Sequence, residues 1–276
     1  MSARFPEIDR RAARRRFERA ATGYEAAARL ETEVGVRMRE RLDYMKVAPR
    51  RVLDAGSGPG REARALAGRY RGAQIVALDS ARAMLPRRGR IERWLGAGVA
   101  SVCADLAHLP LQADSIGLVW SNMALHWLND PLAVFREFAR VLVPEGLVMF
   151  STLGPDTLKE LRAAAGASRV HAFVDMHDLG DMLVEAGFTA PVMDMELITI
   201  DYQAGARLLD DLRASGQTNA RADRARGLSG RQFGERLRHA LDRSPRMTYE
   251  VVYGHAWRRA PSTGSVKTVH VFKRVP

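Results

Sequence analysis

The sequence predicts an α/β protein with a doubly wound, mostly parallel sheet of seven strands. Three observations support this class: an aliphatic run that ends in a glycine-rich turn at 52–60, an alternation of strands with amphipathic helices from residue 51 to 152, and an acid, Asp79, that ends the second strand. Such alternation implies right-handed crossovers and helices on both faces of the sheet. Ligands then bind at the carboxyl ends of the strands.

The chain begins with a helical segment. Apolar residues recur at steps of three and four within residues 9–46, and Gly23 is expected to divide this stretch into two helices. We expect residues 1–48 to form a helical lid segment and residues 49–276 to form the main domain.

The elements of the main domain follow from apolar runs and helical periodicity. Strands are predicted at 51–55, 74–79, 99–104, 116–121 and 146–152, and helices at 61–70, 81–96 and 131–142. Further along, we predict a helix at 177–188, a strand at 191–202, a charged helical stretch at 205–243 and a last strand at 247–258. The regions at about 153–175 and 205–246 are expected to be helical lid insertions above the sheet.

Composition limits the function classes. The chain has 276 residues and a formal net charge of +11, which favours acidic partners, although an arginine-rich solvated surface would give the same value. A single cysteine excludes an internal disulfide and a thiolate zinc cluster. Since no apolar stretch approaches the roughly 20 residues that span a bilayer, we expect a soluble, cytoplasmic protein.

The turn after the first strand predicts the ligand. Its glycines, Gly56, Gly58 and Gly60, have the spacing G-x-G-x-G rather than the G-x-G-x-x-G of dinucleotide sites, and Asp54 precedes them. An acid beside the turn repels a pyrophosphate and suits a cationic ligand with an α-amino group and a sulfonium, which is S-adenosylmethionine (SAM). An ordinary tight turn is the alternative.

Two further acids come at the ends of the second and third predicted strands, at the same edge of the sheet as Asp54. Asp79 is placed to accept hydrogen bonds from both ribose hydroxyls, and Asp105 from the exocyclic amine of adenine, which Leu106 would contact. A plain helix cap is an equally good interpretation of Asp105.

Residues 50–152 resemble the class I SAM-dependent methyltransferases, which have a Rossmann-like fold. The segment Ser121-Asn122-Met123-Ala124-Leu125-His126-Trp127 matches their sequence after the fourth strand. The resemblance implies that Asn122 lies near the methionine part of SAM and that Ser57, Ser80 and Met84 belong to the same site. Ala81 and Gly117 depart from the usual pattern, at positions that are not expected to bind the methyl group.

Four other segments resemble the malonyl-acyl-carrier-protein O-methyltransferases of biotin synthesis: residues 17–24, 154–162, 175–179 and 249–257. This resemblance implies methyl transfer from SAM to the free carboxylate of a malonyl group on acyl carrier protein, to give the ester that primes biotin synthesis. A mitochondrial complex I assembly factor with arginine-hydroxylase activity shares several of these segments, so that function is an alternative. Another small-molecule or RNA methyltransferase, or an inactive SAM-binding module, is a third.

The proposed reaction indicates which residues to look for. A malonyl carboxylate is ionised at neutral pH and needs no general base. A cation should hold it, and of Arg213, Arg162 and Arg246 we favour Arg213, in the charged insertion. Tyr24 could close over SAM, or it could be a core aromatic.

The partners follow from charge and from missing motifs. His177 and His255 are isolated, so no metal site is expected. A basic rim is expected to steer the acidic carrier protein, whereas no nucleic-acid module or membrane segment is found in the sequence. The oligomeric state is left open.

Overall fold

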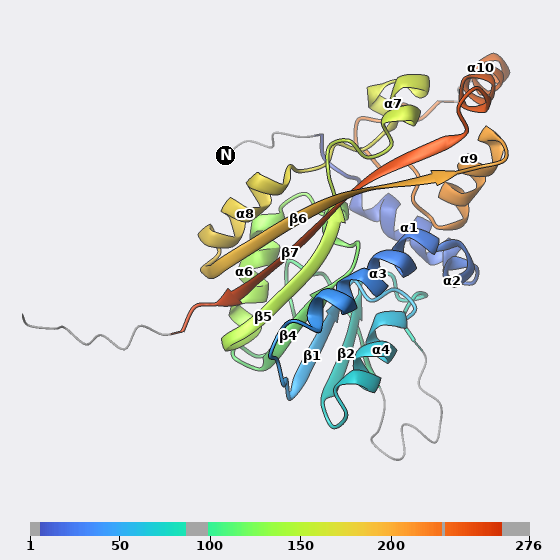
Figure 1. Ribbon diagram of the computed structural model, residues 1–276. Coiled ribbons are helices and arrows are strands. Elements are labelled where there is room, and N and C mark those ends of the chain that lie inside the picture. The colour runs from blue at the N-terminus through green and yellow to red at the C-terminus, as the bar shows by residue number, and fades with distance from the viewer. Residues whose placement is uncertain (1–5, 87–98, 228–229, 261–276) are drawn as a thin grey trace, which may run out of the picture.

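The computed structural model describes residues 6–86, 99–227 and 230–260. Its strands form one seven-stranded sheet in the order β3-β2-β1-β4-β5-β7-β6 (Figure 1). The strands are β1 (Arg51–Ala55), β2 (Gln74–Asp79), β3 (Ala100–Cys103), β4 (Ile116–Ser121), β5 (Leu142–Leu153), β6 (Phe188–Asp201) and β7 (Arg246–Arg258). The neighbours β1–β2, β2–β3, β1–β4 and β4–β5 are parallel, whereas β7 runs antiparallel to both β5 and β6. The predicted α/β class with a mostly parallel seven-stranded sheet is confirmed.

Helices come before the sheet in the chain, cover its faces and lie beyond one of its edges (Figure 1). They are α1 (Arg10–Ala20), α2 (Tyr24–Ala27), α3 (Arg29–Leu42), α4 (Arg61–Arg69), α6 (Pro131–Val141), α7 (Lys159–Ala165), α8 (Met176–Glu185), α9 (Gly205–Ala214) and α10 (Arg231–Asp242), with short 3-10 helices at Leu125–Trp127 and Ala167–Arg169. Local signals start several of them. Asp130 caps α6 by accepting from the Ala133 N–H, and Pro131, which has no N–H to lose, begins that helix.

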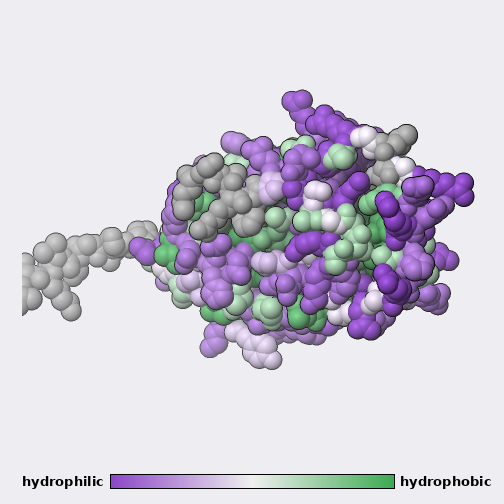
Figure 2. Space-filling view, turned by 90° about the horizontal axis from the view of Figure 1, so that it is seen from above, coloured by the Kyte–Doolittle hydropathy of each residue, from purple (hydrophilic) through white to green (hydrophobic). Residues whose placement is uncertain are grey.

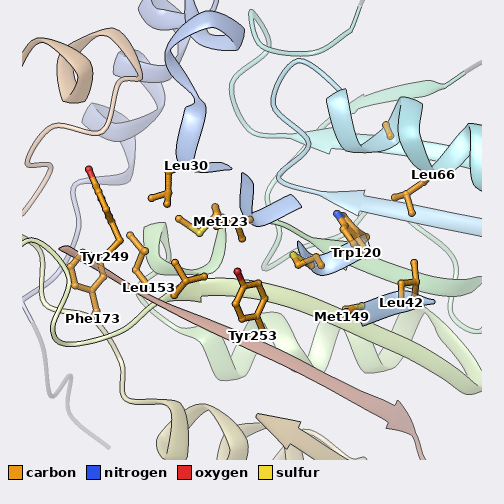
Figure 3. Packing of buried hydrophobic residues seen from close by; sticks show 14 of the residues in the cluster. Leu30, Leu42, Leu66, Trp120, Met123, Met149, Leu153, Phe173, Tyr249 and Tyr253 are labelled. Carbon is orange, nitrogen blue, oxygen red and sulfur yellow. The ribbon is translucent and has the colours of Figure 1, made fainter. Parts of the chain in front are cut away.

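Alternating side chains of the strands feed two cores. In β1, Val52 packs with residues of α3 and α4, whereas Leu53 packs with residues of α6 and α8. The same alternation appears in β5, where Met149 belongs to the first cluster and Phe150 to the second. Figure 3 shows the first cluster, in which Trp120 is fully buried. Since successive side chains of a strand point to opposite faces, both faces of the sheet must be covered by helices.

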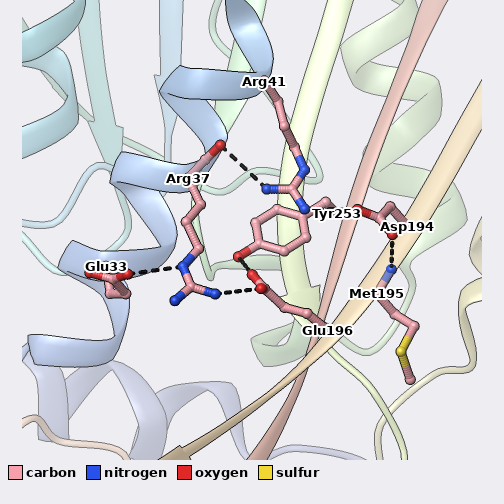
Figure 4. A network of polar contacts seen from close by, with 7 residues as sticks. All are labelled: Glu33, Arg37, Arg41, Asp194, Met195, Glu196 and Tyr253. Carbon is pink, nitrogen blue, oxygen red and sulfur yellow. Dashed lines mark hydrogen bonds and ion pairs between the residues drawn. The ribbon is translucent and has the colours of Figure 1, made fainter.

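The N-terminal helix α3 is fastened to the outer strands by polar contacts as well (Figure 4). Arg37 bridges Glu33 and Glu196, and Glu196 also accepts from the Tyr253 hydroxyl. The Arg41 guanidinium lies 3.8 Å from the centre of the Tyr253 ring. Together with the buried side chains of Leu30, Val34, Met38 and Leu42, these contacts make α3 one of the layers that cover the sheet.

The remaining helices gather beyond the carboxyl ends of β1 and β4. Helices α1, α2, α7, α9 and α10 lie together there, with α10 against both α7 and α9 (Figure 1). Figure 2, seen from above the view of Figure 1, shows mostly hydrophilic side chains over this face, with hydrophobic patches between them. The regions predicted as insertions, at about 153–175 and 205–246, contribute α7, α9 and α10 to this group.

Several predicted elements differ in the structure. The N-terminal segment forms three helices, α1, α2 and α3, rather than two, and β5 begins at Leu142 rather than at 146. Residues 81–86 form a turn rather than the start of the helix predicted at 81–96, because the Asp79 carboxylate accepts from the Ala81 N–H and curls the chain, and residues 87–98 of that prediction lie outside the described residues. The stretch 205–243 is two helices, α9 and α10, because Gly216 takes a φ of +74° just after α9 ends. Strand β6 starts at Phe188, and its register shifts between Thr189 and Val192, where Pro191 cannot donate to the ladder.

The described residues include no helix that is both long and apolar enough to cross a bilayer.

Candidate functional site

The glycine turn forms the floor of a cavity at the carboxyl end of β1. This donor cavity is lined by Tyr24, Glu25, Ala28, Glu31, Thr32, Asp54, Gly56, Ser57, Gly58, Pro59, Arg61, Glu62 and Asn122. Gly56 has a φ of +81°, and a Cβ there would lie 2.3 Å from the Ala124 Cβ. Only glycine fits this position, so the turn leaves backbone N–H groups and open space where a larger residue would fill it.

Asp54 is buried at this floor with one oxygen free. Its Oδ2 has no hydrogen-bond partner within the protein, and because the residue is only 1% exposed, this oxygen is shielded from solvent as well. Burial, reinforced by the neighbouring Glu62 and Asp79, raises the pKa of Asp54 well above its usual value. An unpartnered buried carboxylate oxygen is costly, and a ligand ammonium group would supply both the missing donor and the missing charge.

Asp79 stands at the end of β2, beside the turn. Its two oxygens accept from the Gly58 N–H at 3.0 Å and from the Ala81 N–H at 2.7 Å. Burial raises the pKa of Asp79, while these backbone donors oppose the shift. A carboxylate has about four acceptor positions, so two remain for the hydroxyls of a ribose.

Two further predicted residues form the walls of the donor cavity. The Tyr24 ring lies near Gly58, 3.7 Å from where a Cβ would stand, and burial with nearby Glu31 and Asp79 raises the pKa of its hydroxyl well above the usual value. Asn122 donates to the Glu31 carbonyl oxygen at 2.8 Å and accepts from the Ser151 hydroxyl at 2.8 Å. Both side chains therefore tie the N-terminal helices to the sheet edge.

The other predicted donor-site residues lie around this cavity without lining it. Gly60 caps α4 in a left-handed conformation, and Ser80 follows β2. Met84 is buried, with its terminal methyl 3.8 Å from where a Gly58 Cβ would stand. Leu106 is also buried.

Asp105 has partners of its own. It pairs with Arg10 of α1 and accepts from the Ala107 N–H at 3.0 Å. Partial burial opposes ionisation, but Arg10 and the Ala107 N–H outweigh it and lower the pKa of Asp105. The carboxylate thus anchors α1 and caps the turn that follows it.

A second, larger cavity is bordered by helices α7, α9 and α10. This acceptor cavity has a volume of about 220 Å³, against about 50 Å³ for the donor cavity. It is lined mainly by apolar and aromatic side chains: His126, Trp127, Leu153, Leu158, Leu161, Ala165, Arg169, Val170, His171, Phe173, Leu209, Leu212, Arg213, Gln217, Thr218, Asn219, Phe233, Leu237 and Tyr249. A concave, mostly apolar lining with a few polar groups is typical of sites for small organic ligands.

The two histidines of the acceptor cavity are neutral. Burial lowers the pKa of His126 to about 3, and its Nδ1 has no partner. Burial, with Arg16 and Arg221 nearby, lowers the pKa of His171 to about 4, and its Nε2 accepts from the Ala220 N–H. These two histidines therefore carry no charge at neutral pH, whereas Arg169 and Arg213, which also line the cavity, favour an anionic ligand.

The three candidate arginines are placed differently. Arg213 lines the acceptor cavity, but its side chain is 64% exposed and paired with Asp210 at 2.9 Å. Arg162 donates to the carbonyl oxygens of Pro155 and Thr157, so its guanidinium holds the backbone of the segment before it. Arg246 is exposed on β7, 3.7 Å from Asp201.

Three acidic residues of the donor cavity, Glu25, Glu31 and Glu62, were missed by sequence reasoning. Glu31 of α3 and Glu62 of α4 both line it, and Glu62 is held by Arg39 at 2.5 and 2.6 Å. In the sequence each resembles an ordinary acid in the first turn of a helix, where the macrodipole favours a negative charge. Only the placement of α3 against α4 shows that they share a cavity.

The described residues contain no cluster of three or more histidine, cysteine, aspartate or glutamate side chains that could hold a metal ion.

Comparison with known proteins gives three findings. Residues 53–150 match the model of a methyltransferase domain. The chain is 50% identical over 268 residues to the malonyl-[acyl-carrier protein] O-methyltransferase of Gallionella capsiferriformans, with 92% of each chain covered. It is 51% identical to the enzyme of the same name from Laribacter hongkongensis, covering 91% of this chain and 90% of that protein.

Solved structures agree on the fold. The YcgJ protein of Bacillus subtilis matches 81% of this chain and 98% of its own with a TM-score of 0.58, at 20% identity.

Proposed function

The chain belongs to the family of malonyl-[acyl-carrier protein] O-methyltransferases, and we propose that it transfers the methyl group of SAM to the free carboxylate of a malonyl group on acyl carrier protein. The observation that carries the proposal is the pair of cavities at the sheet edge. One is small and acidic, with an unpartnered Asp54 oxygen, and the other is large and apolar with neutral histidines.

The donor cavity suits SAM by its chemistry. Asp54 would accept from the α-amino group, Asp79 from the ribose hydroxyls, and Gly56 and Gly58 leave space for close approach of the backbone. Tyr24 would cover the methionine part from α2. SAM supplies an activated methyl group on a positively charged sulfur.

The acceptor cavity explains how the reaction could proceed without a general base. A malonyl carboxylate is ionised at neutral pH, so it needs orientation and removal of water rather than deprotonation. Apolar side chains from α7, α9 and α10 line this cavity, and His126 and His171 are uncharged within it. The lid would therefore desolvate the nucleophile and hold it in line with the methyl group.

Incubation of the purified chain with SAM and malonyl-acyl carrier protein tests this function. We expect malonyl methyl ester on the carrier protein, detected by mass spectrometry, and rescue of a biotin auxotroph that lacks the methyltransferase. Absence of ester with a SAM-binding protein would reject the acceptor, and arginine hydroxylation of a protein would favour the alternative activity.

Replacement Arg213→Ala tests the cation that we favour for the carboxylate. Because this arginine is exposed, we expect a KM for malonyl-acyl carrier protein raised by about fivefold, with SAM affinity unchanged. Arg136→Ala is the matched control, since Arg136 is also exposed and paired, with Glu185, but lies on α6 outside the lid. Equal kinetics for both variants would move the carboxylate site elsewhere.

The net charge of +11 would attract the acidic carrier protein. Exposed arginines of α10, such as Arg236 and Arg238, lie on the helix that contributes Phe233 and Leu237 to the acceptor cavity. We expect KM for malonyl-acyl carrier protein to rise by about tenfold between 50 and 300 mM salt, as exposed charges are screened. A KM that does not change with salt would argue against electrostatic docking.

An enzyme that acts on malonyl-acyl carrier protein would work in the cytoplasm.

A further inference from the structure

Glu31 stands between the two cavities. It lines the donor cavity, and its Oε1 accepts from the Nε2 of Gln217, a residue that lines the acceptor cavity. Tyr24 on the donor side and Tyr249 on the acceptor side both lie close enough to feel its charge. Methyl transfer requires the reactive methyl to point from one cavity toward the other, so the sulfonium must lie near this boundary.

The other acids of the donor cavity are accounted for. Glu25 is half exposed and pairs with Arg64 at 2.5 Å, and Glu62 pairs with Arg39. Asp54 lies at the floor, where the amine is expected, and Asp79 beside it binds backbone N–H groups. Glu31, by contrast, has no ion pair with a lysine or arginine in the part of the chain that the structure describes.

We propose that Glu31 is the counter-charge of the SAM sulfonium and the residue by which this enzyme distinguishes SAM from its product, S-adenosylhomocysteine. The inference rests on the proposed methyl transfer, which sets the direction of the methyl group. SAM and S-adenosylhomocysteine share the amine, the carboxylate and the adenosine, and differ in the methyl group and in the charge on sulfur. A carboxylate beside the sulfur therefore attracts only the donor, and its attraction disappears once the methyl has moved.

The Gln217 hydrogen bond suits this role. It holds Glu31 Oε1 and so restrains the carboxylate from acting as a methyl acceptor itself. Once the methyl group has moved, the Glu31 carboxylate faces a neutral thioether instead of a sulfonium. The loss of this attraction favours release of the product.

Proton linkage supports the proposal. Burial raises the pKa of Glu31 to about 7, and the groups that face it are the hydroxyls of Tyr24, Tyr202 and Tyr249 and the amide of Gln217, with Arg29 on its own helix. Below about pH 7 the free enzyme holds Glu31 neutral, and above it Glu31 is ionised. SAM affinity should therefore rise through this range more than the affinity for S-adenosylhomocysteine.

The test is calorimetric and needs no turnover. Dissociation constants for SAM and for S-adenosylhomocysteine are measured on the full chain at pH 6, 7 and 8, for the wild type, Glu31→Gln and the control Glu33→Gln, a residue of the same helix that is 52% exposed and lines neither cavity. Because titration of Asp54 at the shared amine affects both ligands, the ratio of the two constants isolates the group at sulfur. Glutamine keeps the size of Glu31 and can still accept from Gln217, and the thermal midpoint of each variant checks the fold.

We expect the preference for SAM to grow with pH in the wild type, and Glu31→Gln to reduce it by about tenfold at pH 8 and to remove its pH dependence. Glu33→Gln should leave both the preference and its pH dependence unchanged. An unchanged ratio in Glu31→Gln, or an equal loss for both ligands, would overturn the assignment even if methyl ester is still formed. A reduced ratio in an enzyme that forms no malonyl ester would instead reject the acceptor proposal.

Discussion

Asp54→Asn is expected to weaken SAM binding by at least about a hundredfold while making the ligand-free protein more stable. The wild-type carboxylate is buried with an unpartnered Oδ2, so the folded state without ligand carries an uncompensated carboxyl group. An amide of the same shape removes the charge. We expect the free energy of unfolding at pH 7 to increase by about 1 to 3 kcal/mol.

The pH dependence of stability gives an independent check of Asp54. The pKa of this carboxyl is raised in the folded state, so the unfolded chain ionises first and stability falls as pH rises from about 4 toward the folded pKa. Asp54→Asn should flatten this decline. Urea titrations from pH 4 to 8 followed by tryptophan fluorescence measure the free energy of unfolding, and calorimetry measures SAM affinity.

A surface variant controls for the loss of a charge. Asp43 is 61% exposed and pairs with Arg69, so Asp43→Asn should change stability by less than about 0.5 kcal/mol and leave SAM affinity intact. If Asp54→Asn destabilised the ligand-free protein or retained full SAM affinity, Asp54 would not be the group that awaits the amine.

Asp79→Ala is expected to lower SAM affinity by about a hundredfold or more, since two charge-assisted hydrogen bonds to the ribose would be lost. The variant also frees the Gly58 and Ala81 N–H groups, which loosens the turn that receives the ligand. Calorimetry gives the affinity, and circular dichroism shows whether the fold remains.

Asp105→Ala is the comparison for Asp79→Ala. Asp105 already binds Arg10 and the Ala107 N–H, so its loss should affect SAM affinity much less than the loss of Asp79. A larger effect at Asp105 would restore the adenine contact inferred from sequence, and full affinity in Asp79→Ala would remove the ribose assignment.

Local patterns were sufficient for the sheet and for the donor turn. A largely aliphatic run such as 52–55 is stable only in a strand that is buried on both faces of the sheet. Gly56 has a backbone conformation that other residues avoid. Both features can therefore be predicted without knowledge of any distant neighbour. The helix predicted at 81–96 was wrong over residues 81–86, because one hydrogen bond from the Ala81 N–H to the Asp79 carboxylate overrides a weak helical pattern.

The second cavity and the boundary between the cavities depend on contacts far apart in the chain. Glu31 and Gln217 are separated by 186 residues, and neither carries a local signal that distinguishes it from a surface polar residue. The preference for Arg213 came from its charged segment, but the pairing with Asp210 and the exposure of its side chain depend on how α9 packs.

Periodicity and residue type alone were thus enough to predict the α/β class, which depends on short-range geometry. The sign of the charge on Asp54 led to the cationic ligand that stays a prediction at this edge of the sheet. The unpartnered state of Asp54, the neutral histidines of the acceptor cavity and the position of Glu31 between the cavities emerged only from the folded chain. Burial and partner sets are properties of segments brought together across the sheet, and they determine whether a carboxylate is a solvated surface group or a binding group.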